Sequence, residues 1–409
     1  MGWVSPARFH TQPSQFAPAT ALTCSRRSLT SRLRLDEIRQ RCNCSNRRMG
    51  DASGELDVFD AGRCAGGYAL GLAVGRRFAG AIRSRMRQDL VLREQLLPFA
   101  STAAARPLLA ALQASNSERY PRYWDELLGT ADGSGVPLLH VILVNFRKEI
   151  QPFIPKAGGD DGRKEEGEPD GDCSDVLVVS DSTAIAAHNE DGNVALLGHT
   201  YLVRATLPDG LSFTAYTYAG ELPSCAFGFN SNGVAFTLDS VPPVNDEIAA
   251  GAIARNFVSR DLLEAKDLED AMHRICSPSV SVGHSYNLMD VRGRRIVNVE
   301  TASGNRFAVH EAGAAPFFHA NMYRHLQVKQ VQDENSMSRE KRAAQCSVDS
   351  KETALSLLGD TADDKYPIYM TGPTLHTLCT VLVDLDDKTM TIYRGNPKNA
   401  DITLVLPML

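Results

Sequence analysis

Residues 158–179 read GGDDGRKEEGEPDGDCSDVLVV, and the character of the chain changes within this stretch. The run from Gly158 to Asp172 is acidic and rich in glycine, which is typical of a loop and not of a packed element. Directly after Cys173, the apolar run Val176–Val179 is typical of a short buried strand. Cys173 therefore stands where a loop meets a buried strand.

A cysteine at such a junction has two interpretations. Most cysteines are packing residues, so Cys173 can be a partly buried loop residue. Alternatively, if the bond between Asp172 and Cys173 is cut, the thiol and a new α-amino group stand together. An α-amine has a pKa of about 7.7–8 and a thiol about 8.5, so the amine can accept the thiol proton near neutral pH. The residue then carries a nucleophile and its own base.

Hydrophobic spacing predicts helices before this loop and mainly strands after it. Before the loop we expect a strand at 56–59 and helices at 68–99, 107–128 and 137–148. After it we expect strands at 176–187, 194–207, 211–218, 225–230, 234–241, 281–290, 295–300, 307–310, 376–384, 389–394 and 402–407. Helices are expected at 248–264, 268–276 and 351–358, and an exposed loop or helix at 328–350. Hairpins in place of regular βαβ units favour an α+β fold with two layered antiparallel sheets and helices outside.

Composition excludes several classes of function. The 409 residues are 43% hydrophobic and 22% charged, with a net charge of -6. No basic stripe with interleaved aromatic residues is present, so nucleic acid is not an expected partner. No apolar run is long enough to span a bilayer, so no membrane partner is expected. The nine cysteines form no CxxC pair, which disfavours a structural zinc site, and we expect neither a metal nor a cofactor.

The first residues differ in composition from the rest. Residues 1–48 contain nine arginines, two acids and many Ser and Thr residues, as organellar transit peptides do. Met49 offers a second interpretation, in which translation starts there. The first interpretation predicts a plastid or mitochondrial protein and the second a cytoplasmic one, and both stay open. In either case we expect residues 1–48 to lie outside the fold as a disordered extension.

Several short motifs follow one another in a family-specific order. They are Tyr120–Leu127 (YPRYWDEL), Cys173–Asp175 (CSD), His188–Asp191 (HNED), Gly228–Val234 (GFNSNGV), Phe318–Asn321 (FHAN) and Arg394–Pro397 (RGNP). In their order and spacing the chain resembles the isopenicillin N acyltransferase-like (acyl-coenzyme A:6-aminopenicillanic acid acyltransferase-like) family of N-terminal-nucleophile hydrolases. The resemblance runs from about Phe59 to Pro397.

This resemblance implies an αββα sandwich, in which two antiparallel sheets lie between helical layers. It implies self-cleavage between Asp172 and Cys173. Residues 49–172 would form a helical pro-segment or small chain, and residues 173–409 the catalytic chain of one composite domain. The two processed chains would stay associated as a heterodimer. The implied substrate is a small amide or thioester, such as an N-acyl amino acid or amine, which reacts through an acyl-enzyme.

The resemblance also implies site residues. Cys173 is the nucleophile, Asp191 orients its α-ammonium group, and the amide of Asn321 stabilises the oxyanion. The simpler interpretation of Asp191 is a hairpin turn, Glu190-Asp191-Gly192, and that of Asn321 is a hydrogen-bonded buried amide. Asn287 is expected to line the site.

Three residues depart from the family pattern: Asp172 where glycine is common, Asp239 where asparagine is usual, and Thr374 near an arginine of the penicillin-acylating member. Asp239 and Thr374 are expected near the substrate, and β-lactam substrates are not expected. These departures motivate an alternative, an unprocessed and inactive relative that serves as a binding or scaffold protein. A third possibility is a conventional thiol hydrolase that uses His188 or His319 as its base without cleavage, although each histidine is more simply a local packing residue.

Overall fold

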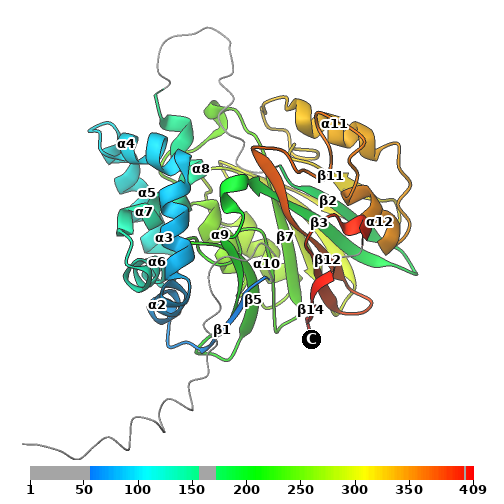
Figure 1. The fold of residues 1–409 in the computed structure, drawn as a ribbon, viewed down its shortest axis with the longest axis horizontal. Coiled ribbons are helices and arrows are strands. Elements are labelled where there is room, and N and C mark those ends of the chain that lie inside the picture. The colour runs from blue at the N-terminus through cyan, green and yellow to red at the C-terminus, as the bar shows by residue number, and fades with distance from the viewer. Residues whose placement is uncertain (1–55, 156–171, 400–401) are drawn as a thin grey trace, which may run out of the picture. The chain divides into compact units, whose positions relative to one another are not determined.

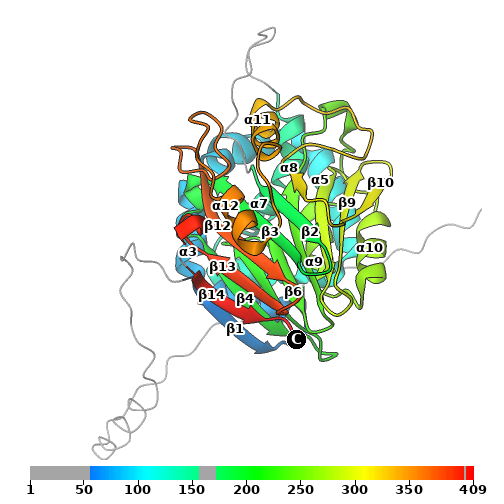
Figure 2. The ribbon, with the colours of Figure 1, turned by 90° about the vertical axis from the view of Figure 1, so that its right-hand side faces the viewer.

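The computed structural model describes residues 56–155, 172–399 and 402–409, so the predictions for residues 1–48 and for most of the acidic loop lie outside the described residues. Two β-sheets pack face to face, with helices on both outer faces (Figures 1 and 2). This arrangement confirms the predicted α+β class and αββα sandwich.

The larger sheet has eight strands in the order β1-β4-β5-β6-β7-β8-β9-β10. Their bounds are Val58–Arg63, Thr200–Thr206, Ser212–Tyr218, Phe227–Asn230, Val234–Ser240, His284–Asp290, Arg295–Ala302 and Arg306–Glu311. The smaller sheet has six strands in the order β11-β2-β3-β12-β13-β14. Their bounds are Phe317–His319, Ser174–Val179, Ala184–Asn193, Leu375–Asp384, Thr389–Tyr393 and Ile402–Pro407. β1 pairs with β4 in parallel, so the prediction of purely antiparallel sheets is wrong at this edge.

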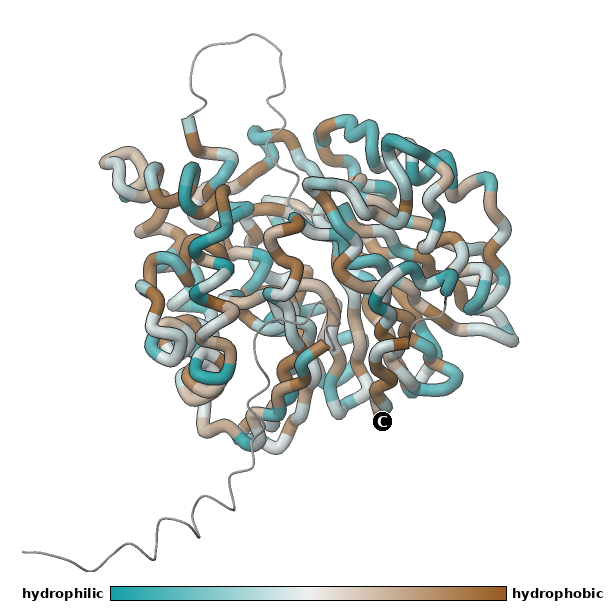
Figure 3. Tube along the Cα trace, viewed as in Figure 1, coloured by the Kyte–Doolittle hydropathy of each residue, from teal (hydrophilic) through white to brown (hydrophobic). Residues whose placement is uncertain are grey.

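Side chains on alternate faces of the strands belong to two different hydrophobic cores, one between the sheets and one under the outer helices. In β2, Leu177 packs into the apolar layer between the sheets, whereas Val176 and Val178 pack outward against α11 (Glu334–Ala343) and α12 (Lys351–Leu358). Successive strand residues point to opposite faces, which is why one strand serves two cores. Figure 3 shows hydrophobic residues concentrated along the central strands and more hydrophilic ones over α11.

The remaining helices cover the outer face of the larger sheet. They are α2 (Gly67–Arg77), α3 (Ala79–Gln88), η1 (Val91–Leu96), α4 (Leu97–Ala100), α5 (Ala105–Arg119), α6 (Pro121–Ser134), α7 (Leu138–Asn145), α8 (Arg147–Ile150), α9 (Arg255–Leu262) and α10 (Leu268–Cys276). Short 3-10 turns are η2 (Gln151–Phe153), η3 (Val194–Leu196), η4 (Asn245–Glu247) and η5 (Pro397–Asn399).

Glycines bring α2 and α6 into direct backbone contact. A Cβ atom on Gly71 would lie 2.0 Å from the carbonyl oxygen of Glu126, and one on Gly129 would lie 2.2 Å from that of Tyr68. No side chain fits between these two helices, so their separation depends on glycine at both positions.

All three helices predicted before the loop are interrupted. The expected helix 137–148 breaks at Phe146, between α7 and α8. The expected helix 68–99 breaks at Phe78, whose ring stacks on Tyr201 with centroids 3.5 Å apart, and again at Asp89, which is extended. The expected helix 107–128 breaks at Tyr120, because the residue before a proline avoids the helical region and Pro121 starts α6.

The predicted turn Glu190-Asp191-Gly192 is also wrong, because these residues lie inside β3. β3 pairs with β2 on one side and with β12 on the other, which holds the motif in an extended conformation. Among the described residues, no helix is both long and apolar enough to cross a membrane.

Candidate active site

Cys173 lies directly before β2, and its side chain is 6% exposed. Its Sγ atom is 3.7 Å from Oε2 of Glu190 and 4.0 Å from the backbone oxygen of Asp191. Sγ, a ring nitrogen of His188 and a carboxylate oxygen of Glu190 all lie within 4.8 Å of one another. The thiol therefore faces a histidine and an acid from the neighbouring strand.

The register of the β2–β3 hairpin explains this contact. Asp175 pairs with His188 across the two strands. Residues two apart share a face of a strand, so His188 and Glu190 point to the same side as Ala186, which belongs to the core between the sheets. The apolar layer between the sheets thus becomes polar at the end where Cys173 lies.

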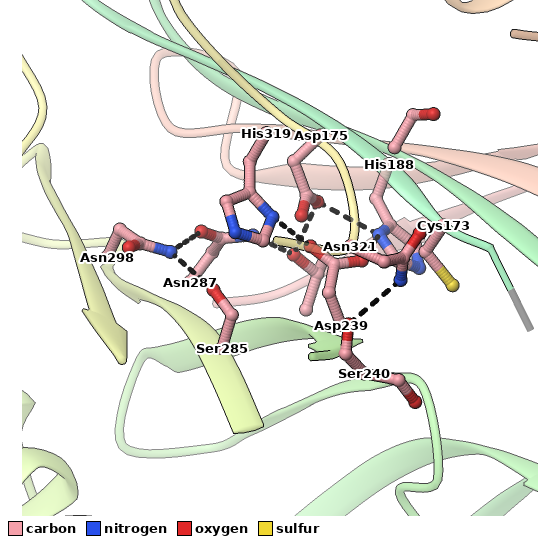
Figure 4. A network of polar contacts seen from close by, with 12 residues as sticks. Cys173, Asp175, His188, Asp239, Ser240, Ser285, Asn287, Asn298, His319 and Asn321 are labelled. Atoms are coloured by element: carbon pink, nitrogen blue, oxygen red, sulfur yellow. Dashed lines mark hydrogen bonds and ion pairs between the residues drawn. The ribbon is translucent and has the colours of Figure 1, made fainter. Parts of the chain in front are cut away.

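A chain of polar contacts continues from His188 into the larger sheet (Figure 4). Nδ1 of His188 is 2.9 Å from Oδ1 of Asp175, which also accepts a hydrogen bond from the Thr237 hydroxyl at 3.2 Å. Asn287 donates to that hydroxyl oxygen at 2.9 Å, and Asn298 donates to Asn287 at 2.9 Å. All five residues are buried. Asn287 therefore lies inside this network and orders β7 against β8.

Asp239 belongs to the same buried layer. Its Oδ2 is 3.0 Å from Nδ1 of His319, and its Oδ1 is 3.7 Å from Nδ1 of His188. Burial and the nearby charge of Asp175 raise the pKa of Asp239 well above its ordinary value. Asp239 is thus a partner of two histidines in the layer between the sheets.

The surroundings of His188 favour its charged form. Burial opposes its charge, but the carboxylate of Asp175 outweighs burial and raises the pKa of His188 well above its ordinary value. Burial likewise opposes ionisation of Asp175, yet its pKa falls below the usual range because His188 is beside it. An imidazolium has no free lone pair, so His188 cannot accept the thiol proton in this state.

The thiol itself is disfavoured as an anion. Burial and then the charge of Glu190 raise the pKa of Cys173 well above its ordinary value. Burial also raises the pKa of Glu190. Oε2 of Glu190 accepts a hydrogen bond from Nε2 of His188 at 3.0 Å, and its Oε1 accepts one from the Tyr218 hydroxyl. From the sequence, Glu190 falls in the motif His188–Asp191 and in a predicted turn, and its contact with the thiol was not predicted.

Asp191 points to the opposite face of β3. Its Oδ1 accepts a hydrogen bond from the Thr377 hydroxyl at 2.5 Å, while its buried Oδ2 has no hydrogen-bond partner among the described residues. Burial raises the pKa of Asp191 to about 7. One carboxylate oxygen is therefore available to a donor that the described residues do not supply.

Arg339 lies beside the peptide bond that precedes Cys173 and also contacts Asn321. Nδ2 of Asn321 donates to the backbone oxygen of Ser240 at 2.9 Å, and its Oδ1 accepts from Arg339 at 2.9 Å. Nη1 of Arg339 is 3.1 Å from the backbone oxygen of Asp172. Arg339 was not predicted, because its segment is strongly charged and has the composition of an exposed loop or helix.

A cavity of about 310 Å³ lies between the helices before the loop and residues after it. Its polar lining includes Arg85, Asp89, Arg147, Tyr218, Glu221 and Arg255. Tyr218 connects the cavity to Glu190 through its hydroxyl. Asp239, Asn287 and Thr374 do not line this cavity. The backbone oxygen of Thr374 instead accepts a hydrogen bond from Val194 at 2.9 Å.

Two groups of described residues have donor types suited to a metal ion: Cys173 with His188 and Glu190, and Asp175 with Asp239 and His319. In both groups the histidine contacts a carboxylate of the same group at hydrogen-bond distance. These contacts make both groups polar networks, and in the second group Oδ2 of Asp175, Oδ1 of Asp239 and Nε2 of His319 are buried without a hydrogen-bond partner among the described residues.

The sequence matches one family profile and one characterised relative. The family profile described as acyl-coenzyme A:6-aminopenicillanic acid acyl-transferase matches residues 178–399. The chain is 24% identical over 372 residues to the β-alanyl-dopamine/carcinine hydrolase of Drosophila melanogaster, covering 84% of this chain and 94% of that one.

Two solved structures are similar at low identity. One is a penicillin V acylase from Agrobacterium tumefaciens (10% identity, TM-score 0.32, 55% of this chain and 83% of that one). The other is a mutant of the conjugated bile acid hydrolase from Clostridium perfringens (12% identity, TM-score 0.35, 58% of this chain and 92% of that one).

Proposed function

Because the chain belongs to the acyl-coenzyme A:6-aminopenicillanic acid acyl-transferase family, we propose that it is a cysteine N-terminal-nucleophile amidohydrolase or acyltransferase that activates itself by cleavage before Cys173. The observation that carries the proposal is the position of Cys173. Its thiol faces Glu190 and His188 at the start of a buried strand, and its preceding carbonyl is contacted by Arg339.

Cleavage would supply a base for the thiol within the same residue. Burial raises the pKa of the Cys173 thiol, and the carboxylate of Asp175 raises the pKa of His188, which favours the charged imidazolium. A free α-amine with a pKa of about 7.7–8 can take the thiol proton near neutral pH. The thiolate then attacks a substrate carbonyl and forms an acyl-enzyme. Water completes hydrolysis, and an amine completes acyl transfer.

Asp191 and Asn321 would support this chemistry. The unpartnered Oδ2 of Asp191 is suited to accept a hydrogen bond from the new α-ammonium group. Nδ2 of Asn321 carries two hydrogens and uses one on Ser240, so the second is available to an oxyanion. Removing one such donor typically costs about 10²–10³-fold in kcat.

The substrate we propose is a small polar amide. Cys173 does not line the cavity of about 310 Å³, but Tyr218 does, and the Tyr218 hydroxyl contacts Glu190 beside the thiol. Ion pairs line this cavity, including Arg85 with Glu221 at 2.5 Å. That lining suits a compact charged molecule better than a long acyl chain. The name of the Drosophila relative makes carcinine and β-alanyl-dopamine the first compounds to assay. N-acyl amino acids form the second class.

One experiment separates this proposal from its alternatives. On a denaturing gel, wild-type protein should give two fragments, the second beginning at Cys173, whereas Cys173→Ala should stay as one chain. Both fragments should elute together under native conditions as a heterodimer. An intact wild-type chain without amidase activity would support the inactive binding protein that Asp172, Asp239 and Thr374 suggest. An intact but active chain would support the conventional thiol hydrolase.

A further inference from the structure

We infer that Arg339 stabilises the oxyanion that forms on the backbone carbonyl of Asp172 when the chain cuts itself. This inference rests on the proposed function and assigns its first step to a residue outside the predicted site. Arg339 lies on α11, in the segment between Asn321 and the C-terminal strands.

The guanidinium contacts both sides of the scissile bond. Its Nη1 lies 3.1 Å from the backbone oxygen of Asp172 and 2.6 Å from that of Cys173. The same nitrogen is 2.9 Å from the hydroxyl of Ser174. A cation beside a carbonyl oxygen is worth most where charge develops in a water-excluded site, and Arg339 is 0% exposed.

The rest of the side chain is fixed in place. Nη2 donates to Oδ1 of Asn321 at 2.9 Å and to the Ser336 hydroxyl at 3.2 Å. Nε donates to Oδ1 of Asn335 at 2.9 Å. All three nitrogens of the guanidinium thus donate hydrogen bonds that fix its position. Little reorganisation is needed when negative charge forms on the carbonyl oxygen.

The charge of Arg339 has only a weak counterion. Among the residues that the structure describes, the carboxylate within ion-pair distance is that of Asp172, at 3.8 Å. A buried cation with so little compensation is costly for stability. Its position is therefore better explained by a charge that forms during a reaction than by the resting structure.

Asn335 binds the side chain of Asp172, the residue that departs from the family pattern before Cys173. Its Nδ2 donates to Oδ2 of Asp172 at 2.6 Å, so the side-chain carboxyl is anchored to α11. The same helix thus holds the carboxyl of Asp172 through Asn335 and its backbone oxygen through Arg339. This anchoring gives a physical reason why aspartate is accepted where the family commonly has glycine.

The step that Arg339 would assist is an N-to-S acyl shift. The sulfur of Cys173 bonds to the carbonyl carbon of Asp172 while the thiol proton passes towards the amide nitrogen of Cys173, leaving an oxyanion beside Nη1. The C–N bond then breaks, the amine of Cys173 takes up the proton, and a thioester remains. Water hydrolyses the thioester, which releases the α-carboxylate of Asp172 and restores the thiol.

The test is the rate at which freshly made full-length precursor converts to two fragments. Arg339→Met should slow conversion by about 10²–10³-fold, the effect of losing one oxyanion donor. Millimolar guanidinium should restore part of the rate, which a merely structural loss would not allow. Arg342→Met is the matched control on the same helix, because Arg342 pairs with Asp360 at 2.8 Å and should leave conversion unchanged.

Folding is checked by comparing the melting of Cys173→Ala with that of the double variant that also carries Arg339→Met. If the methionine variant does not fold, Arg339→Gln decides, since it keeps an N–H donor and loses the charge. Wild-type conversion in a folded Met or Gln variant overturns this inference and leaves the proposed function intact. A wild-type chain that never cuts itself overturns both.

Discussion

The carboxylate of Glu190 lies against the thiol of Cys173, with Oε2 3.7 Å from Sγ. The charge of Glu190 is the second cause, after burial, of the raised pKa of the thiol. The charge of this neighbour therefore opposes thiolate formation near neutral pH, in addition to burial.

Glu190→Gln should lower the pKa of Cys173, because it removes that negative charge and keeps an oxygen that can accept from His188. We expect the pH profile of self-cleavage to shift to lower pH, which timed gels across a pH series would measure. Glu221→Gln, a buried acid on the cavity side, is the control. A slower reaction without a shift would instead identify Glu190 as the proton acceptor.

His188→Ala should lower the free energy of unfolding by about 3–5 kcal/mol, because it leaves the buried carboxylates of Asp175 and Glu190 without their cationic partner. Urea denaturation in the Cys173→Ala background measures this loss. His273→Ala, at an exposed position on α10, should change it by less than about 0.5 kcal/mol. A stable His188 variant that cannot cleave itself would make His188 the chemical base.

Asp191 should make the uncut protein less stable as pH rises. Burial raises its folded-state pKa to about 7 from an ordinary 3.8, so the folded state holds the proton more tightly than the unfolded state. The free energy of unfolding therefore falls between about pH 4 and pH 7. In the Cys173→Ala background, Asp191→Asn should add a few kcal/mol above about pH 7, at about 1.4 kcal/mol per pKa unit.

Below about pH 4, Asp191 is largely protonated in the folded and the unfolded state alike. Asp191→Asn should therefore have no pKa-linked effect on stability there. In cut protein the α-ammonium of Cys173 would favour the charged carboxylate, so Asp191→Asn should lose its advantage there. An equal gain in cut and uncut protein would argue against the proposed contact between the two groups.

Gly71→Ala should separate α2 from α6, because its Cβ would lie 2.0 Å from the carbonyl oxygen of Glu126. Overpacking of this kind costs about 1–3 kcal/mol, measured as a lower urea midpoint. Gly66→Ala is the control, since a Cβ there meets nothing within 4 Å. Equal midpoints for the two variants would mean that the helices adjust freely.

The sequence predicts much of this fold because alternation and turn residues are local signals. α12 and β14 begin and end at the predicted residues, 351–358 and 402–407. The interruption at Asp89 is not local: its carboxylate contacts Arg85 and Arg147, which lie on two different helices. Arg147 is far from Asp89 in the sequence, so a local sequence pattern around residue 89 cannot predict this contact.

The site divides in the same way. Cys173, Asp191 and Asn321 are predicted through motifs, and their proposed roles await the experiments above. Glu190 gains its neighbour from the β2–β3 register, which places it on the face opposite Asp191. Arg339 is missed because α11 (ENSMSREKRA) is rich in charged residues, and such a run normally faces solvent.

The parallel strand β1 has a consequence for the energetics of the whole molecule. β1 lies before Cys173 in the chain, yet Val58 pairs with Leu202 of β4 inside the larger sheet. After cleavage that sheet would be shared by two polypeptides, so unfolding would release two molecules and its midpoint would rise with protein concentration. Refolding would require the two polypeptides to associate. The lifetime of the folded, cut protein would therefore be set by a slow rate of unfolding and not by fast refolding.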